Sequence, residues 1–187
     1  MAAIVIILSI TFTTTVTSNA ADLRNGSAFS FKLSDPKGKF NNGATISAHK
    51  KAFDTAYAKI NAASSKIKLV RSGSGPTIRT RSTSKRDEWY GQMSGNSKGS
   101  TITINNYTTT RDKFNQANYN KTALHEMGHA FGMKHQSSSS ITVMKQGKYA
   151  YNDYTTLDKN NIKYKYGSEA TQMKNLSQRC FFSHFYY

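Results

Sequence analysis

The amino-acid sequence predicts a single α+β domain, built as a twisted sheet of about five strands with helices packed on it. Three observations support this class. Short segments rich in Val, Ile and Thr, bounded by Gly- and Ser-rich turns, indicate strands. Longer segments repeat apolar residues every three or four positions, which indicates amphipathic helices. Without an N-terminal leader, roughly 167 residues remain, which is enough to bury one core without disulfide bonds.

The amino terminus is typical of an export signal. Residues 2–12 are almost wholly apolar but too short to cross a bilayer as a helix, and Ser18-Asn19-Ala20 offers the small residues that signal peptidase requires. We expect a signal peptide over 1–20, one folded domain over 21–167 and a C-terminal tail over 168–187. The protein is then secreted and extracellular, without a mature transmembrane helix. An uncleaved anchor stays open as the alternative, because no Lys or Arg precedes the apolar run.

The first half of the domain contains a strand, a helix and then further strands. Ala28–Leu33 alternates as a first strand. A helix follows with Thr45 as its cap, and its apolar stripe consists of Ile46, His49, Phe53, Tyr57 and Ile60. We interpret His49 as a packed histidine rather than a metal ligand.

The next strands are expected at 67–70 and 77–81, with Trp89 and Tyr90 beginning another. The clearest strand is Ser100-Thr101-Ile102-Thr103-Ile104-Asn105, because its residues are mostly β-branched.

The most informative segment of the chain is an eleven-residue run that reads H-E-x-x-H-x-x-G-x-x-H, from His125 to His135. The pattern predicts a helix that begins at an Asn120 cap and ends at Gly132. Its core-facing residues are Leu124, Met127 and Phe131.

This spacing describes a metal site. Residues four apart share one face of a helix, so His125 and His129 can present their imidazoles to one ion. Gly132 can take a left-handed turn that brings His135 to the same ion. Three neutral nitrogens with one open position are typical of a catalytic zinc site, so we expect one Zn²⁺. Glu126 is then placed to deprotonate the attacking water. The alternative is a helix whose histidines only pack or face solvent.

The complete motif resembles that of the metzincin clan of zinc peptidases, and its matrixin-like branch in particular. Met144 looks like the clan's Met-turn methionine, which lies beneath the metal, although methionine also fills gaps in ordinary cores. Residues 154–167, which end in Tyr-Gly, look like the C-terminal helix of the matrixin-like branch, with Asp158 in a structural role. The resemblance covers about residues 28–167.

The resemblance implies a metzincin-like catalytic domain. Its twisted sheet is mainly parallel and is followed by the active-site helix, the Met-turn and the C-terminal helix. Its substrate-binding edge strand corresponds to Thr101, Ile102, Thr103, Ile104 and Asn105. An edge strand has unpaired backbone groups on which an extended peptide can dock. The pocket for the residue after the scissile bond is expected between the active-site helix and residues 145–154.

The sequence departs from the clan at three places. Gln136 follows the third histidine, where matrixins often have serine. Gln146 stands where astacin-like and serralysin-like relatives place a tyrosine ligand. No prodomain with a zinc-blocking cysteine fits the sequence, because the lone Cys180 lies in the tail.

The residues and the resemblance together predict a secreted zinc-dependent endopeptidase. One alternative is a cationic cell-surface-binding protein with a vestigial zinc site, but binding zinc alone does not need Glu126. The other is a zinc hydrolase of a non-protein substrate, although the extended motif favours peptides. We expect a monomer whose partner is a protein or peptide substrate.

The net charge suggests a second kind of partner. The chain has 26 Lys and Arg against 10 Asp and Glu, for a formal charge of +16. Such a field attracts anionic cell-envelope polymers, which can retain the enzyme at the cell surface. No motif for specific nucleic-acid binding accompanies the charge. The acids form no ligand cluster and indicate no Ca²⁺ site, so calcium is possible only through backbone carbonyls.

Overall fold

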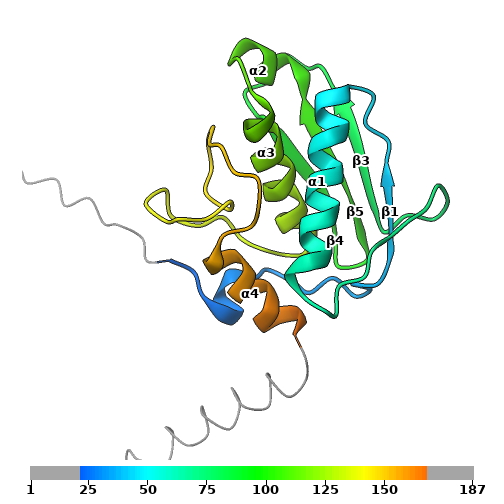
Figure 1. The fold of residues 1–187 in the computed structure, drawn as a ribbon, viewed down its shortest axis with the longest axis vertical. Coiled ribbons are helices and arrows are strands. Elements are labelled where there is room, and N and C mark those ends of the chain that lie inside the picture. Colours follow the sequence, from blue (N-terminus) through cyan, green and yellow to red (C-terminus); the bar gives the residue numbers. More distant parts are fainter. Residues whose placement is uncertain (1–21, 168–187) are drawn as a thin grey trace, which may run out of the picture.

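A computed structural model describes residues 22–167 of the chain (Figure 1). The expected signal peptide, Cys180 and the aromatic tail lie outside the described residues. No helix within residues 22–167 combines the length and the apolar content needed to cross a membrane. In chain order the elements are η1 (Asn25–Ala28), β1 (Lys39–Asn42), α1 (Ser47–Ala63), β2 (Val70–Arg71), β3 (Ile78–Thr83), β4 (Gly91–Asn96), β5 (Gly99–Asn105), α2 (Asn106–Arg111), α3 (Gln116–Ala130) and α4 (Thr156–Tyr166).

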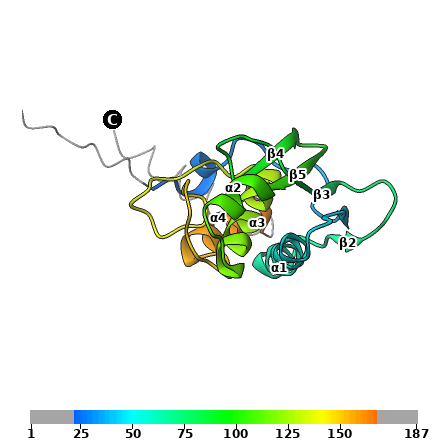
Figure 2. The same ribbon diagram turned by 90° about the horizontal axis from the view of Figure 1, so that it is seen from above.

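The sheet has five strands in the order β2-β1-β3-β5-β4. The pairings among β2, β1, β3 and β5 are parallel, whereas β4 is antiparallel to β5. Helices α1 and α3 lie together on one face of the sheet (Figure 2). Residues of β3 alternate between buried and exposed, as expected for a sheet covered on one face. The predicted α+β class with a mainly parallel sheet is confirmed.

The core fills the space between the sheet and the two long helices. Phe53 and Ile60 of α1, Ile102 and Ile104 of β5 and Leu124 of α3 are all fully buried. Helix α1 is therefore the predicted amphipathic helix. It begins at Ser47 after an Ile46 N-cap that makes no side-chain capping bond, so the predicted cap at Thr45 is wrong.

His49 is packed within the core, as the sequence predicted. Its side chain is completely buried, with Nδ1 3.0 Å from the Ser82 hydroxyl and the ring 5.1 Å from that of Tyr119. Its Nε2 has no hydrogen-bond partner.

The predicted strand at Ala28–Leu33 is wrong. Ala28 ends the short helix η1, and Phe29 makes only an isolated bridge with Met133. Ala28, Phe29 and Leu33 of this segment are buried, but its backbone groups bond to other elements: Leu33 N–H donates to the Tyr166 hydroxyl at 2.7 Å. The alternating hydrophobicity here belongs to a loop that packs on the core, not to a strand.

Helix α3 begins earlier than predicted. Its N-cap is Asn115, whose side chain accepts a bond from Asn118 N–H at 3.0 Å, and Asn118 completes a capping box by bonding back to Asn115 N–H. The predicted cap, Asn120, lies inside the helix and donates to Asn152. Both asparagines have the chemistry of a cap, and the reciprocal bond with Asn118 favours the earlier one.

The strand predicted as the substrate-binding edge, Thr101–Asn105, is not an edge strand. It belongs to β5, which pairs with β3 on one side and with β4 on the other. The edge of the sheet is β4, which returns antiparallel to β5 through a tight hairpin. Its sequence, GQMSGN, has two glycines and no β-branched residue, so only its start was indicated, by the strand expected to begin at Trp89 and Tyr90.

Candidate active site

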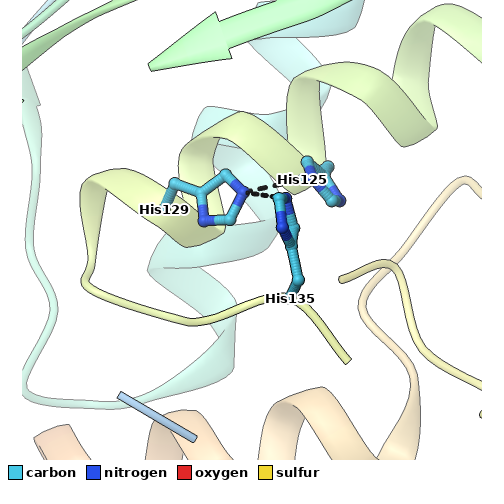
Figure 3. Close-up of side chains that lie close together, drawn as sticks. All are labelled: His125, His129 and His135. Carbon is cyan, nitrogen blue, oxygen red and sulfur yellow. Dashed lines mark hydrogen bonds between the residues drawn. The ribbon is translucent and has the colours of Figure 1, made fainter. Parts of the chain in front are cut away.

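Helix α3 and the turn after it bring the three motif histidines together (Figure 3). His125 and His129 lie one helical turn apart, with their Nε2 atoms 3.1 Å from each other. His135 approaches from the loop, and its Nε2 lies 3.0 Å from that of His129. The three predicted metal ligands therefore converge as expected from the spacing.

The turn depends on Gly132. Its φ is +84°, in the left-handed region that glycine adopts without steric cost. A Cβ at this position would also lie 2.2 Å from the carbonyl oxygen of Phe31. The glycine thus ends α3 and lets the chain pass closely under the N-terminal segment on its way to His135.

Backbone carbonyls fix the tautomers of two histidines. His125 Nδ1 lies 2.8 Å from Val143 O, and His129 Nδ1 lies 2.7 Å from Met133 O. Because a carbonyl only accepts, each Nδ1 carries the proton and each Nε2 presents a lone pair. Burial lowers the pKa of His129 to about 4 and that of His125 well below its usual value. Both rings are therefore neutral at neutral pH.

This donor set fits a zinc ion. The unprotonated Nε2 atoms of His125 and His129 cannot hydrogen-bond to one another, yet they lie 3.1 Å apart. Tetrahedral Zn²⁺ with nitrogen ligands at about 2.0–2.1 Å places those ligands about 3.3 Å apart. His125 is buried while His135 is exposed, so one side of the group is open to solvent. The chemistry is that of a catalytic site rather than a closed structural one.

Met144 packs against α3 at Gly128, which precedes His129 in the chain. Its side chain is fully buried against α3, where a Cβ on Gly128 would lie 2.5 Å from its sulfur. The preceding turn is held by the buried Asp158 of α4, which accepts bonds from the Thr142 hydroxyl and from Val143 N–H. Val143 in turn provides the carbonyl that orients His125. Asp158 has the structural role that the sequence suggested.

Glu126 lies beside the histidines, and its side chain is buried under β4. A Cβ on Gly91 would lie 2.9 Å from its Oε1. Burial raises the pKa of Glu126 to about 8, opposed by the Lys121 ammonium and by the Met93 backbone N–H.

A cleft of about 460 Å³ opens over the histidines and Glu126. Its walls come from β4 and the segment before it, from α3, and from the loop after Met144. The lining residues are Glu88, Trp89, Tyr90, Gly91, Gln92, Met93, Lys121, Thr122, His125, Glu126, His129, His135, Gln146 and Gly147. Lys121 was not predicted as a site residue, although it lies four residues before His125 and so on the same helical face.

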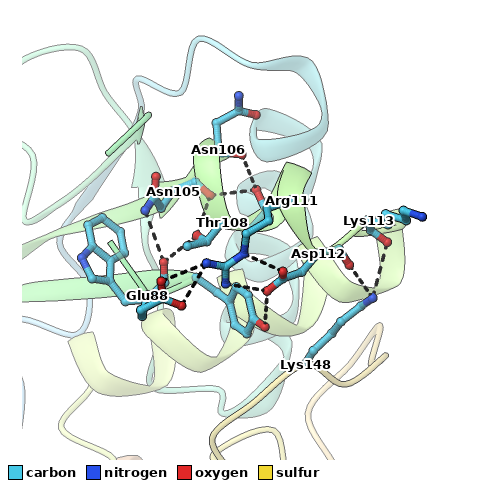
Figure 4. Close-up of polar contacts among 11 residues, drawn as sticks. Glu88, Asn105, Asn106, Thr108, Arg111, Asp112, Lys113 and Lys148 are labelled. Carbon is cyan, nitrogen blue, oxygen red and sulfur yellow. Dashed lines mark hydrogen bonds and ion pairs between the residues drawn. The ribbon is translucent and has the colours of Figure 1, made fainter. Parts of the chain in front are cut away.

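A polar network braces one end of the cleft (Figure 4). The Tyr90 hydroxyl donates to Asp112 at 2.6 Å, and Arg111 bonds to both Glu88 and Asp112. Lys148 donates to the Asp112 carbonyl at 2.6 Å. The Arg111 bond, followed by that from Tyr90, lowers the pKa of Asp112 to about 2. The network joins α2 to the segment before β4 and to the loop after Met144.

Solved structures support the fold. One structure of myroilysin has 14% identity and a TM-score of 0.50, covering 73% of this chain and 96% of that chain. A second has 13% identity and a TM-score of 0.52, covering 76% and 87%. At this level of identity the likeness concerns the fold alone.

No curated protein matches the chain in sequence. The family model for matrixin, however, matches residues 9–167, which include every element of the fold and the whole histidine motif. The three convergent histidines are the donor set that a zinc enzyme of this family needs. The chain therefore belongs to the matrixin family of zinc metalloendopeptidases.

Proposed function

We propose that the protein is a secreted endopeptidase in which His125, His129 and His135 hold the zinc ion and Glu126 is the general base. The observation that carries this proposal is the convergence of three Nε2 lone pairs beside a buried carboxylate in one cleft. When bound, zinc supplies a Lewis acid that makes water more acidic and polarises the substrate carbonyl.

The protein's own groups account for the proton transfers. Glu126 accepts a proton from the attacking water and returns it to the amine that leaves when the peptide bond breaks. Glu126 lines the same cleft as the histidines, and its burial under β4 separates it from competing bulk water. Met144 supports the floor of the site by packing against Gly128.

The substrate docks on β4 in this proposal. As the edge of the sheet, β4 has one side without a strand partner among the described residues, and its residues Gly91, Gln92 and Met93 line the cleft. An extended peptide can bond to that free side as one more strand, which places a peptide bond over the histidines. This role replaces the one expected for Thr101–Asn105.

Two alternative functions predict different properties. A vestigial zinc site in a surface-binding protein has no need for Glu126, whose burial costs free energy without helping to hold metal. A hydrolase of non-protein substrates has no need for a free strand edge beside the metal. The buried carboxylate and the position of β4 therefore favour an endopeptidase.

The deciding experiment combines metal analysis with casein or gelatin zymography on the purified protein. We expect about one zinc per chain and proteolysis that chelators and hydroxamates abolish. Zinc without proteolysis would favour the surface-binding alternative, and proteolysis that survives complete metal removal would refute the zinc mechanism. Sequencing of the exported protein's N-terminus tests secretion, with a start near Ala21 expected.

A further inference from the structure

Lys121 is the one lysine that lines the cleft. It is only 3% exposed, although lysine is among the residues least often buried. Within the described part of the chain it makes no ion pair. A buried ammonium with no carboxylate in contact is costly, which suggests that its charge has a function.

The ammonium is held in a fixed position with one donor left over. It donates to the carbonyls of Lys145 at 2.7 Å and Gly147 at 3.2 Å, and the ring of Tyr149 lies 5.8 Å away. An ammonium has three N–H donors, so two bonds to carbonyls leave one for another acceptor. Burial lowers the pKa of Lys121 to about 8, with Glu126 opposing the shift, so the group is charged at neutral pH.

The position of Lys121 on α3 places its charge near the expected substrate. Four residues of helix span about 6 Å along its axis, so Lys121 lies about one turn from the ligand His125. Neighbouring residues of an extended peptide are about 3.8 Å apart, so the side chain next to a scissile bond at the histidines can reach this depth. The carbonyls that hold the ammonium belong to the loop after Met144, which was expected to line the pocket for the residue after the scissile bond.

We propose that Lys121 is a specificity-determining residue that selects substrates with Asp or Glu immediately after the scissile bond. This inference rests on the proposed endopeptidase function. A carboxylate in this pocket accepts the remaining N–H of Lys121 and provides the missing counter-ion. The ammonium is already desolvated by folding, so only the substrate carboxylate loses its water on binding. An apolar side chain would leave the charge buried and unpaired.

The test uses a series of peptides that differ only at the residue after the scissile bond, with Glu, Gln, Leu or Lys there. We expect kcat/KM for Glu to exceed that for Gln by about 10- to 100-fold, the usual range for a hydrogen bond to a charged group. Lys should be the poorest residue. A fifth peptide with Gln there and Glu four residues away has the same net charge as the Glu peptide. It should behave like the Gln peptide, because its carboxylate lies outside the Lys121 pocket. An effect of the overall positive field would instead make it behave like the Glu peptide.

Substitutions at Lys121 distinguish a lysine that selects the substrate residue from one that only holds the loop after Met144. Lys121→Met should bring the Glu to Gln ratio close to one while the Leu peptide is still cleaved, and Lys121→Glu should reverse the preference toward Lys. The matched control is Lys163→Met, on the exposed side of α4. A lysine that only holds the loop would lower cleavage of all peptides equally in Lys121→Met.

The outcomes are distinguishable. A wild-type Glu to Gln ratio near one, or a high ratio retained in Lys121→Met, would overturn the inference and leave the endopeptidase proposal intact. Failure of the zinc-loaded wild type to cleave any peptide would overturn both. If Lys121→Met does not fold, as shown by thermal unfolding and zinc content, the wild-type series decides by itself.

Discussion

Hydrogen bonds of individual residues prepare the metal site before any ion binds. His125 and His129 each donate from Nδ1 to a backbone carbonyl, and these carbonyls come from segments that follow α3 in the chain. Their Nε2 lone pairs are therefore directed by the fold rather than by the metal. Glu126 makes no comparable bond to the histidines, in keeping with a separate role as a base.

Substitutions should separate the ligands from the base. Glu126→Gln should retain about one zinc per chain but lose at least about 100-fold in kcat, the usual scale of general-base removal. His129→Ala should lose the zinc itself. Metal analysis after dialysis and peptide hydrolysis check both, with Asp54→Asn on α1 as a surface control. If zinc-loaded Glu126→Gln turned over normally, another residue would have to be the base.

His49 gives the fold a pH dependence that is unrelated to the metal. It is fully buried, with one nitrogen unpartnered, and burial lowers its pKa from 6.5 to about 4. Between these pH values the unfolded chain binds a proton that the folded protein does not. The free energy of unfolding is therefore highest above pH 6.5, and the contribution of His49 is lost as the pH falls toward 4.

Replacing His49 should remove this loss of stability at acid pH. At about 1.4 kcal/mol per pKa unit, the wild-type free energy of unfolding should fall on the order of 3 kcal/mol from this group between pH 6.5 and 4. His49→Phe should show a smaller fall over this interval in urea titrations. Ser82→Ala removes the partner of Nδ1 but retains the histidine, so it should keep the wild-type slope. Equal slopes for His49→Phe and wild type would contradict the assignment.

At the scale of elements, α4 supports the metal site through Asp158. This buried carboxylate bonds to Thr142 and Val143 in the Met-turn and also to Thr155 at the N-cap of α4. It thereby joins the start of the last helix to the carbonyl that orients His125.

Removing Asp158 should therefore affect both stability and metal binding. Asp158→Ala leaves buried donors unsatisfied, and we expect a loss of about 2–4 kcal/mol in the free energy of unfolding together with weaker zinc binding. Asp153→Ala is the matched control, because its ion pairs with Lys59 and Lys159 are partly exposed and should be worth less than about 1 kcal/mol. Equal effects of the two variants would refute the special role of Asp158.

Local signals predicted some elements and not others. Helix α4 was predicted within residues 154–167, because its capping residue and its final glycine, Thr155 and Gly167, are local features of the sequence. The position of β4 at the sheet edge was not, because its pairing with β5 supplies the stability that its own residues lack. Strand propensity pointed instead to the neighbouring strand β5, whose residues are mostly β-branched.

At the scale of the whole molecule, the residues around the metal could be predicted from the sequence, whereas the rest of the cleft could not. The ligands and Glu126 lie within eleven consecutive residues, so helical geometry and one glycine sufficed to predict their convergence. The rest of the cleft comes from β4, from an earlier turn of α3 and from the loop after Met144. Those segments meet only through tertiary packing, so helical spacing, which places Lys121 on the face of His125, did not show that this lysine lines the cleft.

The charge of the molecule is distributed beyond the cleft. Arg79 and Arg81 alternate along β3 with the buried Ile78 and Thr80, so they lie on the side of the sheet away from α1 and α3. Exposed basic residues continue into the loop before β4. The exposed residues in this region include Arg79, Arg81, Lys85 and Arg86. With a formal charge of +16, the protein should associate with anionic envelope polymers through this side.

Raising the salt concentration should weaken attachment to anionic polymers without affecting catalysis. Retention on beads coated with teichoic acid should fall steeply as salt rises, because exposed charges are screened beyond about 8 Å at physiological ionic strength. Arg79→Gln combined with Arg81→Gln should lower retention more than Lys163→Gln combined with Lys165→Gln, which removes the same charge from α4. Cleavage of a small uncharged peptide should hardly change over the same salt range, since it depends on the buried site. Retention that does not respond to salt would exclude electrostatic attachment.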